Sequence, residues 1–577
     1  MVNQRSTNWT AITCLLAISC ILFLQNLGTP YITLWDEAIQ VNVVKNLAEH
    51  CCLPQLHRSV NVNAMNGDAR ADSGSLPRFD YKNWTNNTLW LHKPRLPFYV
   101  TAGIYRLLGG SLWALRLPGA IFALLTAVVI YLIGHKFLSD RIGLCGAAIF
   151  SLNPYTNQLV HGRQFSGFPD LAFAFFVSVA LYLILDWTKS KSTATLRWLG
   201  LVLGLASLCK GGLALAPFAV LAGVAILTGR TRDLIPGLQA ILVFGIVALP
   251  ERLYWLTNYP LEFRYEEHQQ LLHLFKVIEG HGGPWHFYFT HYLPSMLGVP
   301  LVLFAYVSIG WALTYCRPSQ PEHTLSIWAL AYLVPLSFGA SKVENFIFAV
   351  LPAIALLVPG MVESLMYSRR FRFVISLCLG SLAVFIISRA TEGNTIWTFM
   401  RARGYEHPYR LALLAVSTML AAALATLFLI KLESKTVTTS LVVLTLGGLL
   451  LVYIGTDILA NRGQPADSSA QATLRQTGSK LQALVDDKNG LILSHYGSVE
   501  DAYLYLMYWS GLDVLDVCHG PQPARTVGRF RERKDIYLVT DRSFPSEPLA
   551  TLPIGNLYTL QAVPFDVWGP AATQVCQ

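Results

Sequence analysis

The sequence has little charge for its length. Of its 577 residues only 13% are Asp, Glu, Lys or Arg, whereas 53% are hydrophobic. Soluble globular domains carry about 25% charged residues, so the composition excludes an ordinary soluble protein. Together with many apolar runs of about 20 residues, it predicts a polytopic membrane protein. In a membrane protein, the positions of lysine and arginine indicate the orientation of the chain in the membrane. We therefore do not interpret the net charge of +9 as a sign of nucleic-acid binding, and we expect no nucleic acid among the partners.

Several sequence motifs are missing as well. The ten cysteines include no pair at CxxC spacing, which excludes a zinc ribbon and a thioredoxin-like redox motif. No P-loop and no GxGxxG run is present, so we expect no nucleotide cofactor. No HExxH motif supports a zinc protease. The chain also shows no internal repeat, a feature that many transporters have.

Apolar segments of spanning length define the predicted transmembrane domain. They lie near residues 10–27, 112–134, 142–160, 168–186, 234–252, 290–315, 324–339, 345–364, 373–390, 409–431 and 438–458. The first segment continues past Cys20 without a clean cleavage site, so we expect an uncleaved span rather than a signal peptide.

The region 198–229 needs a different interpretation. As one helix it would measure about 48 Å, against a hydrocarbon core of about 30 Å. Basic residues flank it: Lys189, Lys191 and Arg197 before it, Arg230 and Arg232 after it. If both basic clusters are cytoplasmic, the chain crosses the membrane an even number of times between them. We therefore expect two short spans with Lys210 at the outer turn, and about thirteen transmembrane helices in all.

The character of the chain changes after the last apolar segment. We assign 1–459 to a transmembrane domain and 460–577 to a small soluble α/β domain on the outer side. The second part opens with a polar linker and an amphipathic helix, and "GLILSHYG", "KDIYLVTD" and "NLYTLQAV" are typical of strands. Cys518 and Cys576 could pair there because an outer compartment permits disulfides, but the sequence does not fix their distance.

Unusual polar residues cluster at the outer ends of the predicted spans. Asp36 and Glu37 directly follow the first span. They could simply begin a helix, whose dipole favours carboxylates, or provide a general base at the membrane surface. Lys93 lies in "WLHKPRLPFYVTAGIYRLLGG", whose second half suits an interfacial helix with its aromatic side in the lipid. An ordinary snorkelling lysine is the alternative.

Three further residues point to the same side of the membrane. Asp170 lies at the N-terminal end of an apolar helix, where it either begins the helix or is the second member of an acidic site. Lys210 lies in "GLASLCKGGLALAP", and a lysine in such surroundings needs a functional reason. Lys342 lies at the outer end of the span 324–339. Five histidines, at 268, 273, 281, 286 and 291, could indicate a metal, but we expect most of them to be interfacial.

The combination of lysines and acids favours one chemistry. Lysine binds phosphate as a point charge, and a carboxylate can remove a proton from a hydroxyl. A phosphate ester carried on a lipid satisfies both requirements and needs no nucleotide.

These residues and motifs resemble a known family. "DEA" after the first span, "HKPRLPFY", "GLASLCKGG", "RYEEHQQLL", "GHGGPWHFYF" and "SKVENFIFAVLPAIALL" look like the lipid-linked-sugar glycosyltransferases of the GT-C fold. The strongest likeness is to the bacterial aminoarabinose transferase and protein O-mannosyltransferase superfamily. It spans roughly residues 30–365, with the motifs in the same order and topology.

The resemblance implies an inverting transfer from a polyprenyl-phosphate sugar to a lipid, glycan or protein acceptor at the outer, periplasmic face of the inner membrane. The matching positions are Asp36, with Glu37 beside it, and Asp170 for catalysis; Lys93, Lys210 and Lys342 for the donor phosphate; and His92 and His268 for the divalent metal that lies near them in some relatives. We add Arg95, two residues after Lys93, to the residues expected to bind the donor phosphate.

The sequence also departs from the family pattern. The family's "KPP" is "KPR" here, its "TKGP" is "CKGG", its "SKLP" is "SKVE", and Ile39 replaces an arginine. These differences leave the donor sugar and the acceptor open, and Arg95 and Glu344 are candidates for reading a different sugar.

A transporter or lipid flippase is the main alternative. Such proteins also contain many spans and buried charges, but their sites usually lie near the midplane on broken helices. An O-antigen ligase is a second alternative, for which we would expect a large outer loop rich in arginine; 391–408 is only a weak candidate. The clustering of polar residues at one face favours the enzyme.

Overall fold

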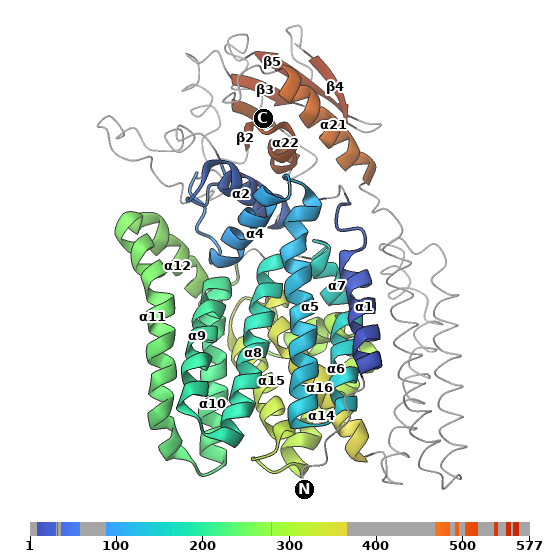
Figure 1. Ribbon diagram of the computed structural model, residues 1–577. Coiled ribbons are helices and arrows are strands. Elements are labelled where there is room, and N and C mark those ends of the chain that lie inside the picture. The colour runs from blue at the N-terminus through green and yellow to red at the C-terminus, as the bar shows by residue number, and fades with distance from the viewer. Residues whose placement is uncertain are drawn as a thin grey trace, which may run out of the picture.

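The structure is a computed structural model of the chain (Figure 1). It describes residues 9–29, 32, 36–57, 88–164, 167–278, 280–365, 468–484, 491–495, 502–516, 536–540, 550–554 and 558–564. The predicted spans 373–390, 409–431 and 438–458, the loop 391–408, and Cys518 and Cys576 lie outside these residues.

A bundle of apolar helices forms the larger part of the described chain (Figure 1). Its members are α1 (Trp9–Leu24), α5 (Leu112–Phe137), α6 (Asp140–Leu152), α7 (Pro154–Val160), α8 (Phe168–Ser190), α9 (Thr193–Lys210), α10 (Ala216–Leu227), α11 (Leu234–Asn258), α13 (Leu293–Leu297), α14 (Val299–Tyr315), α15 (Pro321–Phe338) and α16 (Leu351–Leu365). Within the described residues, five helical stretches are long and apolar enough to cross a membrane, or six if the bent pair Tyr288–Leu297 and Leu301–Tyr315 is one span. The chain is therefore a polytopic helical membrane protein, and the total of thirteen helices stays a prediction.

The region 198–229 reverses direction instead of forming one rod. The whole stretch Thr193–Leu227 is apolar enough to count as one span of 35 residues, but its contacts with α11 show two directions. Along α9, Gly200 lies against Ala240 and Gly204 against Val247, so α9 runs parallel to α11. Along α10, Phe218 packs on Phe244 and Leu221 approaches Gly237, so α10 runs antiparallel to it.

The reversal occurs in the short 3₁₀ segment Gly211–Leu215, directly after Lys210. Gly211 has a φ of +57°, a backbone conformation that glycine adopts at little cost. Lys210 therefore lies at a turn, as the charge pattern predicts.

A second layer covers one end of the bundle (Figure 1). It contains α2 (Asp36–His50) and α4 (Leu96–Leu107), and α12 (Pro260–Phe275) lies at the same end. Helix α4 buries Phe98, Ala102 and Tyr105 while Tyr99 and Leu107 stay exposed. A short amphipathic helix thus follows Lys93, where the sequence predicts an interfacial one.

The C-terminal part contains a mixed sheet next to α21 (Ser468–Leu484) and α22 (Ala502–Ser510). The strands are β1 (Leu491–His495), β2 (Asp513–Asp516), β3 (Ile536–Thr540), β4 (Ala550–Ile554) and β5 (Tyr558–Pro564), in the order β2-β1-β3-β5-β4. Strands β2, β1 and β3 are parallel, and β5 is antiparallel to both β3 and β4. Strands β1, β3 and β5 lie where the sequence predicts strands.

Two large apolar cores hold the described parts together, beside a smaller cluster of Leu91, Trp255 and Phe263. One lies inside the bundle. The other joins α2, α4 and the start of α5 to α22, with Ala38, Ile39 and Val41 packed near Leu504 and Tyr505. The layer that carries Asp36 is therefore buried between the bundle and α22.

The close approach of α9 and α11 gives a test of the fold. A methyl group at Gly200 would overlap the carbonyl oxygen of Ala240. We expect Gly200→Ala to lower the melting temperature of the purified protein, because separating packed helices costs about 1–3 kcal/mol.

Gly103→Ala is the matched control, since a methyl group there meets no atom within 4 Å and alanine favours a helix by up to about 1 kcal/mol. Thermal unfolding in detergent compares the two variants. A Gly200→Ala protein as stable as the control would contradict the described packing.

Candidate active site

Two lysine–aspartate pairs lie at the covered end of the bundle. Asp36 is the first residue of α2, and its Oδ1 lies 2.6 Å from Nζ of Lys93, just before α4. Asp170, in the first turn of α8, forms an ion pair with Lys210, the last residue of α9. The two pairs are close to each other, because Pro94, next to Lys93, lies about 4.0 Å from where a methyl group on Gly211, next to Lys210, would stand. The structure thus brings together four of the predicted site residues.

The pair between Lys210 and Asp170 is the more deeply buried one. The side chains are 11% and 1% exposed. Nδ2 of Asn345 donates to Oδ2 of Asp170 over 3.1 Å, and Nζ of Lys210 donates to the carbonyl oxygen of Asn345 over 3.2 Å. The ring of Phe346 lies 5.3 Å from the ammonium. These contacts offset the desolvation that makes a buried ion pair costly.

The pair between Lys93 and Asp36 remains open to its surroundings. The two side chains are 19% and 21% exposed. A ligand can therefore reach this pair without first unpacking the bundle.

The segment around Lys93 is held from both sides. Before it, Nδ1 of His92 lies 3.0 Å from Oε2 of Glu266, and the amide of Gln270 donates to the carbonyl oxygen of His92 over 3.0 Å. Both partners lie on α12. The backbone at Lys93 is thereby fixed to α12, at the covered end of the bundle.

Arg95 holds the other side of the segment. Its guanidinium contacts Glu251 at 2.6 Å and lies over the rings of Trp255 and Phe263, at 5.1 and 5.9 Å. The side chain is buried. Arg95 thus joins the start of α4 to α11 and α12, whereas the sequence assigns it to the donor phosphate or to the sugar.

The residues predicted to hold a metal do not share a site geometry. Glu266 and Gln270 lie one turn apart on the face of α12 that contacts His92, so His268 between them lies on the other face, where it is exposed. Across the described part of the chain, no three His, Cys, Asp or Glu side chains group as metal ligands. The donors at His92 therefore do not fit the expected divalent ion.

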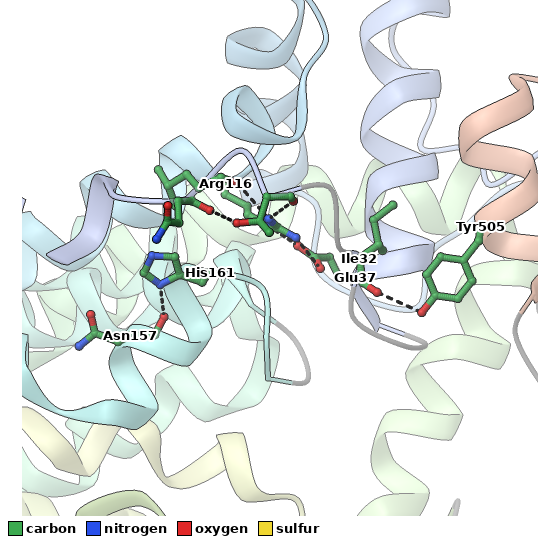
Figure 2. Close-up of polar contacts among 9 residues, drawn as sticks. Ile32, Glu37, Arg116, Asn157, His161 and Tyr505 are labelled. Atoms are coloured by element: carbon green, nitrogen blue, oxygen red, sulfur yellow. Dashed lines mark hydrogen bonds and ion pairs between the residues drawn. The ribbon is translucent and has the colours of Figure 1, made fainter. Parts of the chain in front are cut away.

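Glu37 is engaged by a residue that the sequence does not single out. Arg116 binds both its carboxylate oxygens, at 2.7 and 3.1 Å, and both side chains are buried. Arg116 also donates to the carbonyl oxygens of Leu27 and Thr29 (Figure 2). Glu37 thus holds the connection between α1 and α2 in place. Arg116 lies in an apolar run, as Lys210 does, and a charged residue in such surroundings indicates a buried partner or a functional site.

Lys342 is held by backbone groups. Its ammonium donates to the carbonyl oxygens of Ser337, at 2.8 Å, and of Gly339, at the C-terminal end of α15. A cation is favourable at this end of a helix. Burial lowers the pKa of Lys342. The sequence assigns this lysine to the donor phosphate, but in the structure it caps α15.

The contrast between Glu37 and its neighbour can be measured as stability. Glu37→Gln removes the carboxylate that Arg116 binds through both oxygens, and breaking a buried ion pair typically costs about 3–5 kcal/mol. We expect a clear fall in melting temperature. Asp36→Asn, next in the chain and partly exposed, should change it far less. Thermal unfolding of both variants measures this difference. A larger fall in melting temperature for Asp36→Asn than for Glu37→Gln would contradict the structural role of Glu37.

The sequence of the chain is similar to known glycosyltransferases. Residues 92–255 match the family model described as dolichyl-phosphate-mannose-protein mannosyltransferase. The chain is 28% identical over 282 residues to the undecaprenyl phosphate-alpha-4-amino-4-deoxy-L-arabinose arabinosyl transferase 1 of Pseudomonas fluorescens. This alignment covers 47% of the chain and 49% of the relative, so the match spans about half the length of each.

The fold is similar over nearly the whole chain. ArnT from Cupriavidus metallidurans bound to undecaprenyl phosphate superposes with a TM-score of 0.65 at 15% identity, covering 97% of this chain and 98% of that one. The apo state of the same protein gives 0.62 at 16% identity, with 96% and 97% covered. The chain is therefore a polytopic membrane protein with the GT-C glycosyltransferase fold, as its motifs lead us to expect.

Proposed function

We propose that the chain is an integral-membrane glycosyltransferase. It moves a sugar, with inversion, from a polyprenyl-phosphate carrier to a lipid, glycan or protein acceptor at the outer face of the inner membrane. One observation carries the proposal: the partly exposed Lys93–Asp36 pair lies beside the turn that carries Lys210, where Pro94 approaches Gly211. The partial match to the arabinosyl transferase and the shared fold with a protein that binds undecaprenyl phosphate support the same chemistry.

The charges of the site balance before a substrate enters. Two lysines face two aspartates, so a sugar phosphodiester adds a negative charge to a neutral group. Lys93 is the more exposed lysine and is the one that can turn to the phosphate. Asp36 then loses its cation and becomes available to accept a proton. Donor binding and release of the base are one event in this scheme.

The transfer step needs no covalent intermediate with the protein. Asp36 takes the proton of the acceptor hydroxyl while the oxygen attacks the anomeric carbon. The bond from that carbon to the phosphate oxygen breaks, and its electron pair leaves with the polyprenyl phosphate. Lys93 and Lys210 stabilise the charge that develops on this leaving group.

Asp170 acts through Lys210. Its two oxygens are engaged by the ammonium of Lys210 and the amide of Asn345. These contacts favour a positioning role over direct proton transfer. Asn345 follows the "SKVE" motif, and its own part in the site has no signal in the sequence.

The proposed enzyme has two domains. Residues 1–459 form the transmembrane catalytic domain, and 460–577 form a periplasmic α/β domain. The support is the distribution of basic residues, because arginine and lysine mark cytoplasmic loops, and the packing of α22 on the layer that carries Asp36.

A co-purified lipid is the first test of the proposal. We expect native mass spectrometry of the wild-type protein to detect bound polyprenyl phosphate. Lys93→Ala and Lys210→Ala should reduce its occupancy, since each removes a cation beside the phosphate. Lys136→Ala is the matched control, because Lys136 pairs with Asp186 at the cytoplasmic end. An ion or small metabolite in place of the lipid would favour the transporter.

The base is tested by Asp36→Asn. General-base catalysis typically contributes about 10²–10⁴-fold, so we expect transfer to fall by at least about 10²-fold while the melting temperature stays nearly unchanged. Release of free polyprenyl phosphate from the lipid-linked donor pool of membranes measures the reaction. Transfer at the wild-type rate would remove Asp36 from the role of base.

A further inference from the structure

The connection that leads to Asp36 is anchored at several points (Figure 2). A ring nitrogen of His161 lies 2.8 Å from the carbonyl oxygen of Gln25. Arg116 donates to the carbonyl oxygens of Leu27 and Thr29, at 2.9 and 3.0 Å. These first anchors all come from the helix bundle.

Among the described residues, the anchor nearest to Asp36 on its N-terminal side comes from the C-terminal part of the chain. The hydroxyl of Tyr505, on α22, donates to the carbonyl oxygen of Ile32 over 3.1 Å. Tyr505 is 1% exposed and Ile32 is fully buried. The two residues are 473 positions apart, so this contact ties α22 directly to the approach to the base.

Helix α22 also binds the helix that Asp36 begins. Nδ2 of Asn42 donates to the carbonyl oxygen of Leu504 over 3.0 Å, and Nζ of Lys45 donates to that of Tyr508 over 2.9 Å. Both donors project from α2. Such buried polar groups are tolerated because they are hydrogen-bonded, and here α22 supplies the acceptors. Helix α22 therefore contacts the chain both before Asp36, at Ile32, and after it, on α2.

We infer that α22 is a positioning element of the active site, in which Tyr505 sets Asp36 against Lys93. This inference rests on the proposed function of Asp36. A base must be held within a fraction of an ångström of its working position, and an error of about 1 Å can cost about 10²-fold in rate. Helix α22 thus contributes to the rate of transfer by holding the base.

The test is Tyr505→Phe, which keeps the buried ring and removes only the hydroxyl. Tyr508→Phe is the matched control: it lies on the same helix, and its hydroxyl faces that of Tyr105 at 3.5 Å. We expect Tyr505→Phe to lower kcat about 10- to 100-fold. Polyprenyl-phosphate occupancy, KM for the lipid-linked donor and melting temperature should equal those of the control.

Hydrogen exchange provides a readout that does not depend on activity. Tyr505→Phe should speed amide exchange over residues 32–40, and Tyr508→Phe should not. Unchanged exchange, or a kcat equal to that of the control, would overturn the inference. The inference would also be overturned if kcat, polyprenyl-phosphate occupancy and melting temperature all fell in proportion, because such a result indicates general destabilisation. Faster exchange in a protein whose wild type transfers no sugar would uphold the anchor and reject the proposed function instead.

Discussion

Each charge in an apolar bundle needs a partner. In this protein, these pairings determine how the elements are arranged at the covered end of the bundle. Lys210 is tolerated at the end of α9 because Asp170, the Asn345 carbonyl and the Phe346 ring receive it. Arg116 and Glu37 meet the same requirement between α5 and α2, as do Arg95 and Glu251 between α4 and α11. Each such pair joins separate elements, so neutralising the charges also assembles the site. The pair of Lys93 with Asp36 is more exposed than the pair of Lys210 with Asp170, as the proposed function requires.

The sequence predicts a large part of this arrangement because hydropathy and basic loops are local signals. They give the helical membrane class, the reversal at Lys210, and the placement of Asp36, Lys93, Asp170 and Lys210 at one end. They do not predict a contact whose partner is distant in the chain. The sequence places Glu37 among the catalytic residues and Arg95 at the donor phosphate, but it does not show that their ion-pair partners lie 79 and 156 positions away. No local pattern encodes such pairings, and the carbonyl contacts of Lys342 are equally invisible in the sequence.

The comparison with related structures separates the fold from the residues on it. Nearly the whole chain shares the architecture of ArnT at 15% identity, whereas the matched family segment, 92–255, contains Lys93, Asp170 and Lys210. The departure "KPR" also acquires a physical meaning. Arg95 replaces a proline of the family motif, and its bond to Glu251 couples α4 to α11. In the structure, this difference affects how the layer is held to α11.

The anchors along the connection to Asp36 have a consequence for how freely that connection can vary. His161, Arg116 and Tyr505 all contact main-chain carbonyl oxygens, at Gln25, Leu27, Thr29 and Ile32. Every residue type carries such a carbonyl. Substitutions within the connection that respect its packing therefore leave the contacts intact, whereas the side chains that make them are not interchangeable. The side chains that position Asp36 therefore lie outside the segment that contains it.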